Sequence, residues 1–244
     1  AGRTHDIIEC GDRLLGVEEN KDILDIIKGF MRVHGIRPYD ETTHKGLVRH
    51  ALIRKGFHSG EIMVCLVING KDIPLKEQLV EELCRIKGMT SISYSINQEK
   101  TNVIMGKETR CLWGQGYITD YIGTVKYRIS PLSFYQVNPA QTEKLYGLAL
   151  EYAGLTGNET VWDLYCGIGT IGIALSSHAK KVIGVELNPQ AVKDAQTNAD
   201  LNHIKNIQFV NEDAGDFLVR YAEGGKADVV IMDPPRSGST PEFL

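Results

Sequence analysis

Residues 161–186 constrain the fold more than any other part of the 244-residue chain. They read VWDLYCGIGTIGIALSSHAKKVIGVE, with Asp163 near the end of one apolar run, a glycine turn at Gly167 and Gly169, and Glu186 at the end of a second apolar run. This order predicts a strand, a loop, a helix and a second strand. Glycine lets a backbone approach a ligand closely, and a carboxylate about 20 residues further on can accept hydrogen bonds from ribose hydroxyls. The stretch therefore predicts a site for a nucleoside-containing cofactor.

Strands and helices alternate from residue 160 onward. The predicted strands are 160–164, 181–186, 207–211 and 228–232, and the predicted helices are 170–177, 189–202 and 214–222. Such alternation predicts a parallel sheet covered by helices, with ligands at the carboxyl ends of the strands. Acids stand at four successive strand ends, namely Asp163, Glu186, Asp213 and Asp233. A single acid after a strand is more often a helix N-cap or a loop residue, but four at one sheet edge predict a binding site.

The earlier part of the chain has a different pattern. Helical spacing of apolar residues predicts helices at 20–33 and 75–86, and β-rich runs predict strands at 46–54, 61–69, 91–96, 117–121 and 124–129. A further helix is expected to begin after Asn138, with Pro139 in its first turn, and to end at Gly154. The sequence thus predicts a smaller α+β domain over residues 1–130 and an α/β domain over residues 131–244.

Composition limits the class of protein and the compartment. No apolar run approaches the roughly 18 residues of a membrane helix, and no signal peptide opens the sequence. The five scattered cysteines fit a reducing compartment, so we expect a cytoplasmic protein. The net charge of -4 argues against a strong electrostatic hold on nucleic acid. The chain starts without methionine and stops just after a loop motif, which predicts a segment truncated at both ends.

The glycine turn fits two cofactor classes. Gly167, Gly169 and Gly172 spell GxGxxG, which a nicotinamide or flavin enzyme would use. However, Asp163 stands four residues before Gly167, where a carboxylate would repel a pyrophosphate and attract an α-ammonium group. The stiff Asp-Pro-Pro-Arg loop that starts at Asp233 is associated with methylation of planar bases. We therefore favour S-adenosyl-L-methionine as the cofactor.

Four motifs make the resemblance specific: SFYQVNPAQTEKLY, DLYCGIGTIG, GVELNPQAVKDAQTNADLN and MDPPRSG. Together they resemble the RNA 5-methyluridine (uracil-C5) methyltransferase family, which implies a Rossmann-like class I methyltransferase domain, incomplete at its C-terminus. The resemblance implies that the cofactor is bound by Gln136, Tyr165, Gly167, Gly169, Thr170, Glu186, Asp213 and Asp233. It also implies that the substrate uracil is bordered by Phe134, Gln136 and Asp233. An RNA substrate follows, and ribosomal RNA is favoured over transfer RNA.

The departures from the family pattern concern catalysis. Family members add a cysteine thiolate to C6 of uracil, transfer the methyl group to C5 and then remove a proton with a base. The Ser-Cys-Asn-Pro motif that carries this cysteine, and the basic glutamate, are absent from the sequence, and Cys166 resembles a packing residue of the glycine loop. We therefore expect no catalytic residue in this chain, incomplete cofactor binding and no methylation by the chain alone. We also expect no metal and no iron–sulfur cluster, because Cys10 does not match the cluster position.

Two alternatives stay open at this point. A nicotinamide-dependent oxidoreductase would bind a dinucleotide at the glycine turn, and a catalytically silent RNA-binding module would bind no adenosyl ligand. A basic stretch around the first predicted hairpin is either a solvated strand face or an RNA backbone contact. Its members are Arg49, His50, Arg54, Lys55 and His58.

Overall fold

The computed structural model describes residues 16–222, 225–235 and 238. Backbone contacts divide the chain into two compact units. Unit 1 comprises Ala1–Lys55 and Ile62–Gly116, and unit 2 comprises Gly56–Glu61 and Tyr117–Leu244. The predicted domain boundary after residue 130 stays a prediction, because a compact unit is not by itself an independently folding domain.

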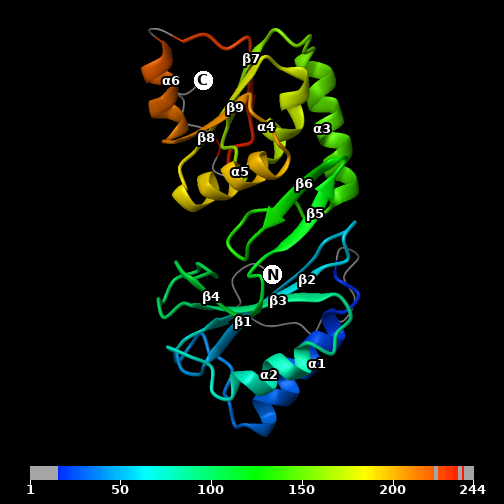
Figure 1. Cartoon of the computed structure of the whole chain (residues 1–244). Helices are drawn as coiled ribbons and strands as arrows, with labels where there is room; N and C mark the ends of the chain where they lie inside the picture. Colours follow the sequence, from blue (N-terminus) through cyan, green and yellow to red (C-terminus); the bar gives the residue numbers. More distant parts are fainter. Residues whose placement is uncertain (1–15, 223–224, 236–237, 239–244) are drawn as a thin grey trace. The chain divides into compact units, whose positions relative to one another are not determined.

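Unit 1 is a four-stranded sheet with two helices on one face (Figure 1). Its elements are α1 (Asn20–Val33), β1 (Val48–Lys55), β2 (Ile62–Ile68), α2 (Lys76–Leu83), β3 (Met89–Ile96) and β4 (Thr109–Gly114). The strand order is β1-β2-β3-β4, and β2 and β3 are parallel while the outer pairs are antiparallel. Ile23, Ile27 and Phe30 lie on one stripe of α1 and are buried against the sheet.

Unit 2 contains a hairpin and a parallel sheet. Its elements are β5 (Ile118–Ile122), β6 (Val125–Ile129), α3 (Pro139–Ala153), β7 (Thr160–Leu164), α4 (Thr170–Leu175), the 3-10 helix η1 (Ser176–His178), β8 (Lys181–Glu186), α5 (Pro189–Leu201), β9 (Ile207–Asn211), α6 (Ala214–Ala222) and β10 (Val229–Met232). The sheet order is β10-β7-β8-β9, and every neighbouring pair is parallel. The alternation of strands and helices predicted from residue 160 onward is confirmed.

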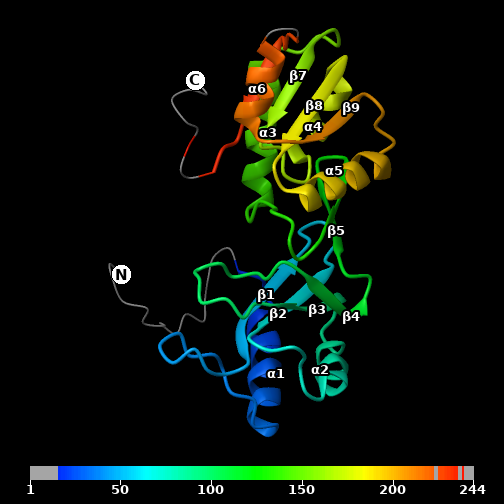
Figure 2. The same cartoon turned by 90° about the vertical axis from the view of Figure 1, so that its left-hand side faces the viewer.

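Helices cover both faces of the parallel sheet (Figures 1 and 2). Trp162 of β7 packs on Phe217 of α6 with ring centroids 5.2 Å apart, which seals one face. On the other face, Gly172 of α4 lies against Val182 of β8, where side-chain atoms already occupy the space that a Cβ would need. The sheet is thus a middle layer, and its strand ends are the places left for polar groups.

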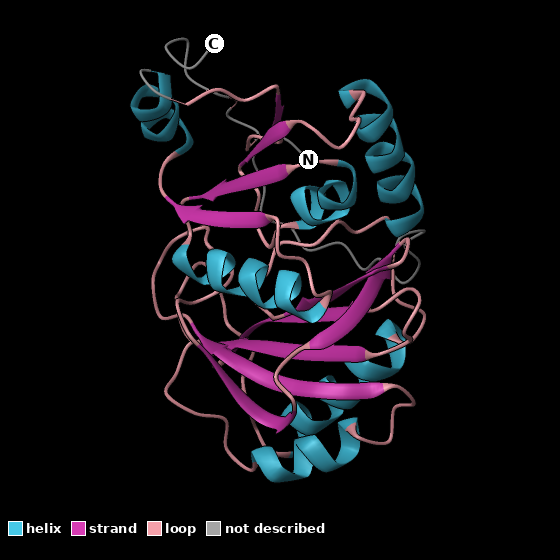
Figure 3. Ribbon diagram, turned by 45° about the horizontal axis from the view of Figure 1, so that its top comes forward, coloured by secondary structure: helices cyan, strands magenta, loops and turns pink. Residues whose placement is uncertain are grey.

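The β5–β6 hairpin is fixed to α5 by two asparagine side chains. Asn198 accepts a hydrogen bond from the Arg128 backbone at 2.7 Å, and Asn202 accepts one from the Lys126 backbone at 2.9 Å. Both amides also donate back to the carbonyl of the same hairpin residue. Strand β6 therefore lies beside α5 inside unit 2, among the strands and helices drawn in Figure 3. Among the described residues, no helix has the length and apolar character needed to cross a membrane.

Candidate functional site

The parallel register brings the predicted residues to one edge of the sheet. Leu164 of β7 is level with Met232 of β10 on one side and with Val185 of β8 on the other. The next residues along the three strands are Tyr165, Asp233 and Glu186, so these three leave the sheet side by side. Asp213 follows β9, which lies beyond β8. The residues predicted from the four strand ends thus lie at or near the carboxyl ends of the parallel strands in unit 2.

The loop after β7 has a backbone that few residues adopt. Tyr165, Gly167 and Gly169 have φ values of 65°, 55° and 82°. A left-handed conformation costs glycine little, so two of these three positions are unstrained. The Cys166 N–H donates to the Val185 carbonyl at 3.0 Å, which ties the loop to β8. The glycines therefore give this loop the tight turn that the sequence predicts.

Glu186 closes the same loop from the neighbouring strand. Its carboxylate accepts from the Gly167 N–H at 3.0 Å and from the Asn188 N–H at 2.7 Å, one bond to each oxygen. Each carboxylate oxygen has a second acceptor site, so both oxygens can still accept from ligand hydroxyls. The half-buried Glu186 is therefore fixed against the glycine loop, and its contact with ribose hydroxyls stays a prediction.

Asp163 is a buried carboxyl behind the glycine loop. Its Oδ2 atom accepts from the Gly172 N–H at 2.8 Å, while Oδ1 has no hydrogen-bond partner. Burial raises the pKa of Asp163 to about 7; the Gly172 N–H lowers it, and Asp233 and Glu186 raise it further. A buried acceptor without a partner is uncommon in folded proteins and fits a donor that arrives with a ligand. A cationic ammonium group would supply that donor and favour the ionised carboxylate.

Thr170 begins α4 and is held by two tyrosines. The Tyr146 hydroxyl of α3 donates to Thr170 Oγ1 at 2.8 Å, and the Tyr127 hydroxyl of β6 donates to the Thr170 carbonyl at 2.9 Å. The Asn198 amide donates to the neighbouring Ile168 carbonyl at 3.2 Å. Sequence reasoning missed Tyr127, Tyr146 and Asn198 as supports of this loop. Nothing in their spacing indicates the contacts, which depend on how the hairpin and α3 pack.

Asp213 has a structural role in this conformation. One of its oxygens, Oδ1, accepts from the Gly215 N–H at 2.8 Å and from the Asp216 N–H at 3.3 Å. It therefore caps the first turn of α6. Its predicted contact with the cofactor stays a prediction, and the cap places the carboxyl group at the same sheet edge.

The predicted substrate residues lie on two segments of unit 2. Phe134 and Gln136 precede α3, where Phe134 is 71% exposed and Gln136 is half-buried. Asp233 follows β10 and is exposed. Burial raises the pKa of Tyr146 to about 12; the Thr170 hydrogen bond lowers it, and Asp163 and Asp233 raise it further. Asp233 therefore lies close enough to Tyr146 and Asp163 to act on both electrostatically, while an approach of Phe134 to Asp233 stays a prediction.

The basic stretch divides between the units: Arg49, His50, Arg54 and Lys55 lie in unit 1, whereas His58 lies in unit 2 with its ring 3.2 Å from Glu143 Oε1. The Arg49 side chain is 2% exposed and donates to the carbonyls of Asn97 at 3.0 Å and Glu99 at 2.8 Å. Lys55 pairs with Glu19 at 2.7 Å. Burial lowers the pKa of Arg54, whose Nη1 atom is inaccessible to solvent. The hypothesis that Arg49 and Arg54 contact an RNA backbone is therefore not supported by the described conformation.

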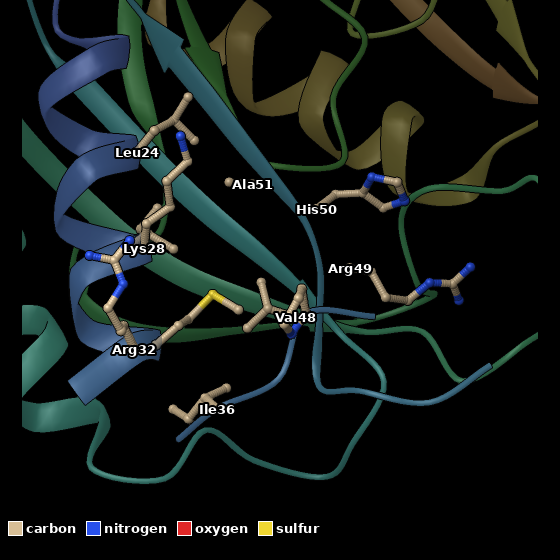
Figure 4. Close-up of a pocket in the computed structure, with 11 residues that line it drawn as sticks. Leu24, Lys28, Arg32, Ile36, Val48, Arg49, His50 and Ala51 are labelled. Carbon is tan, nitrogen blue, oxygen red and sulfur yellow. The ribbon is translucent and has the colours of Figure 1, made fainter. Parts of the chain in front are cut away.

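A pocket of about 510 Å³ opens in unit 1 between α1 and β1 (Figure 4). Lys28 and Arg32 of α1 line one side, and Val48 of β1 lines the other, while Arg49 and His50 extend away from the helix. None of the residues predicted for the cofactor or the substrate lines it. Its lining combines aliphatic side chains with the basic Lys28, Arg32, Arg49 and His50.

The cysteines offer no activated thiolate among those with a resolved pKa shift. Burial raises the pKa of Cys65 to about 11 and raises that of Cys166 well above its ordinary value, and burial also raises the pKa of Cys84. Cys111 lies on β4 in unit 1, and Cys10 lies outside the described residues. In the described part of the chain, no group of three or more His, Cys, Asp or Glu side chains is arranged to hold a metal ion.

Comparisons with known proteins agree with this geometry. The TRM5/TYW2 methyltransferase domain family matches residues 152–244. A protein of Halalkalibacterium halodurans described as an uncharacterized RNA methyltransferase is 48% identical over 99% of this chain and 53% of its own length. One of Clostridium tetani with the same description is 44% identical over 100% of this chain and 54% of its own length. The chain thus spans about half the length of these relatives.

A solved structure extends the similarity to three dimensions. The tRNA (uracil-54, C5)-methyltransferase of Pyrococcus abyssi, solved with S-adenosyl-L-homocysteine, is 27% identical. It has a TM-score of 0.80 and covers 98% of this chain and 56% of its own. The predicted fold class is therefore confirmed: unit 2 has the Rossmann-like core of class I methyltransferases, and the chain is similar over nearly its whole length to RNA methyltransferases.

Proposed function

We propose that this chain is part of an S-adenosyl-L-methionine-dependent methyltransferase that modifies C5 of uracil in RNA. One observation carries the proposal: the buried Asp163, which has an unpartnered oxygen, is the second-last residue of β7, and the Glu186 carboxylate and Asp233 lie at the carboxyl ends of the two neighbouring strands. This edge offers carboxylate acceptors at both ends of the tight loop, for an ammonium group and for ribose hydroxyls. The similarity to RNA methyltransferases supports the same assignment.

The residues predicted for the cofactor have distinct tasks in this proposal. Asp163 accepts from the ammonium group, Glu186 from the ribose hydroxyls, and the loop from Tyr165 to Thr170 lies along the amino-acid end. Asp213 and Gln136 complete the cofactor site. The cofactor supplies the electrophilic methyl group, and the protein supplies orientation and exclusion of water.

Uracil needs an additional step, because its C5 is a poor nucleophile. Addition of a thiolate to C6 would make C5 nucleophilic, after which C5 takes the methyl group from the cofactor sulfonium, and loss of the C5 proton to a base restores the C5–C6 double bond and expels the thiolate. The described cysteines with raised pKa values are poorly suited to this role. We therefore assign the nucleophile and the base to no residue of this chain. Phe134, Gln136 and Asp233 are proposed to border the base, with the exposed Phe134 ring as a stacking surface.

Ribosomal RNA remains our predicted substrate, and transfer RNA is the alternative that the Pyrococcus abyssi neighbour favours. The oxidoreductase alternative is weaker, because a pyrophosphate on the glycine loop would be repelled by the Asp163 carboxylate, which stands four residues before Gly167. We place the site in unit 2 for either RNA.

The first test is ligand binding to the 244-residue chain. S-adenosyl-L-homocysteine should raise the melting temperature and NAD⁺ should not, since a ligand stabilises only the fold that binds it. Stabilisation by NAD⁺ alone would favour the oxidoreductase, and stabilisation by neither ligand would favour the RNA-binding module.

The second test concerns the target base. A chimera in which this chain replaces the matching half of the Halalkalibacterium halodurans relative is incubated with RNA and labelled cofactor. Mass spectrometry of the digested RNA should find 5-methyluridine, and separate ribosomal and transfer RNA pools identify the substrate. Methylguanosine as the product would contradict the uracil assignment.

A further inference from the structure

Two tyrosines converge on Thr170 from different elements of unit 2. Tyr127 comes from β6 and is fully buried, and Tyr146 comes from α3 and is 7% exposed. Tyr127 binds the Thr170 backbone carbonyl and Tyr146 binds the Thr170 side chain. The Tyr127 contact holds the Thr170 backbone in place, and the Tyr146 contact occupies one acceptor site of the Thr170 hydroxyl group.

The Tyr146 contact determines the direction of the Thr170 proton. A threonine hydroxyl has one donor and two acceptor sites. Because the Tyr146 hydroxyl donates to Thr170 Oγ1, the Thr170 proton is not used in that bond. Within the described part of the chain, no hydrogen bond donated by this hydroxyl is formed. The Thr170 hydroxyl therefore keeps its one donor for a group other than Tyr146.

The charges around Thr170 select the group that it would meet. Asp163 and Glu186 are acceptors, and they suit the ammonium and hydroxyl groups of the cofactor. The carboxylate is the anionic group of an adenosylmethionine-type ligand, so a directed hydroxyl donor beside the tight loop suits that group. We propose that Tyr146 is a positioning residue that orients the Thr170 hydroxyl toward the amino-acid carboxylate of the cofactor. This inference rests on the proposed function, because it requires an adenosylmethionine-type ligand.

The test compares two ligands that differ in one group. S-adenosyl-L-homocysteine has the carboxylate, and its decarboxylated form lacks only that group. Calorimetric titration of the 244-residue chain should show that Tyr146→Phe weakens binding of the first ligand about threefold to tenfold, the worth of one net hydrogen bond. Binding of the decarboxylated ligand should stay unchanged. Thr170→Val should likewise weaken binding of S-adenosyl-L-homocysteine and leave binding of the decarboxylated ligand unchanged. Thr170→Ser keeps the hydroxyl group and should bind both ligands as the wild type does.

A matched variant controls for effects on the helix. Tyr152 lies on the same helix and is 83% exposed, so Tyr152→Phe should change the binding of neither ligand. Equal losses for both ligands in Tyr146→Phe, or no loss for either, would overturn the positioning role. Failure of both the unaltered chain and the chimera with the Halalkalibacterium halodurans relative to bind S-adenosyl-L-homocysteine would instead overturn the proposed function, and the inference with it.

Discussion

The two sheets of this molecule distribute their polar groups differently. In unit 1, β1 and β4 run opposite to β2 and β3, so the carboxyl ends of the strands are divided between two edges. In unit 2, all four strands run the same way, and their carboxyl ends share one edge. Glu186, Asp213 and Asp233 therefore lie at or just after strand ends that share this edge. The comparison teaches that parallel strands bring the residues at their carboxyl ends together, whereas antiparallel strands separate them.

The charged residues of the two units also meet different partners. Arg49 is held by two backbone carbonyls of its own unit, whereas Asp163 keeps one oxygen without a partner. Removing Arg49 should therefore damage the fold of unit 1, and changing Asp163 should alter the response of unit 2 to pH. The chain has two tryptophans, Trp113 in unit 1 and Trp162 in unit 2, so fluorescence of single-tryptophan variants follows each unit separately.

The largest expected effect concerns Asp163. Its pKa of about 7 in the fold exceeds the ordinary value of 3.8, so between these pH values the folded state holds a proton that the unfolded state has released. Stability of unit 2 should fall by about 3 to 4 kcal/mol as pH rises through this window. Asp163→Asn should remove this dependence, as measured by urea unfolding with Trp162 fluorescence.

An exposed aspartate provides the control for that titration. The Lys76 side chain lowers the pKa of Asp72 from its ordinary value of 3.8, so this group is ionised in both the folded and the unfolded state through most of the window up to pH 7. Asp72→Asn should therefore leave the pH profile in that window intact. An unaltered slope in Asp163→Asn would show that other groups cause the dependence.

The second effect concerns the buried guanidinium of unit 1. Arg49→Met keeps the aliphatic stem and removes the donors to Asn97 and Glu99, which should cost about 2 to 3 kcal/mol of stability. Unfolding monitored through Trp113 measures this loss. Arg85→Met is the control, because the Arg85 side chain is 72% exposed. Full stability of Arg49→Met would mean that the residue is available for RNA after all.

The third effect compares two helical glycines within unit 2. A Cβ at Gly172 would lie 2.8 Å from Asp163 Oδ2, which cannot withdraw without losing its bond to the Gly172 N–H. Gly172→Ala should therefore cost about 1 to 2 kcal/mol and weaken binding of S-adenosyl-L-homocysteine. A Cβ at Gly147 would meet nothing within 4 Å, so Gly147→Ala should stabilise α3 slightly. Similar outcomes for the two variants would contradict the close packing behind the loop.

The smallest effect on stability concerns Phe134. Its ring is 71% exposed, so Phe134→Ala should change the unfolding free energy by less than about 0.5 kcal/mol. Binding of a uridine-containing RNA should nevertheless weaken, because stacking on an aromatic ring is lost. Phe57→Ala provides the comparison, since Phe57 is 64% exposed and has no predicted contact with the base. Equal RNA affinities for both variants and the unaltered chain would remove Phe134 from the site.

The local rules of helices and strands predicted much of the fold. Asn138 accepts from the Gln141 N–H and Gly154 ends α3 in the left-handed conformation, as the sequence indicated. The first helix, predicted over 20–33, begins differently: Glu19 occupies its N-cap position without a capping side-chain bond. Strand β4 was not predicted, because its alternation is weak and its burial is slight. Its place is set by pairing with β3, a tertiary contact.

The candidate site was predictable only in part. The acids at the strand ends follow from topology, since parallel strands bring their ends together whatever the loops do. The supports of the loop do not follow, because Tyr127, Tyr146 and Asn198 come from elements whose packing no periodicity specifies. The same limit applies to Arg49. Its charge suggested a contact with an RNA backbone, but its side chain is buried, which the sequence does not indicate.

A crystal structure of this chain with S-adenosyl-L-homocysteine tests the central claim most directly. We predict the ribose hydroxyls within hydrogen-bond distance of Glu186, the ammonium group beside Asp163 and the carboxylate beside Thr170. A ligand seated in the pocket between α1 and β1, or a ribose turned away from Glu186, would contradict the assignment of the site to the strand ends of unit 2.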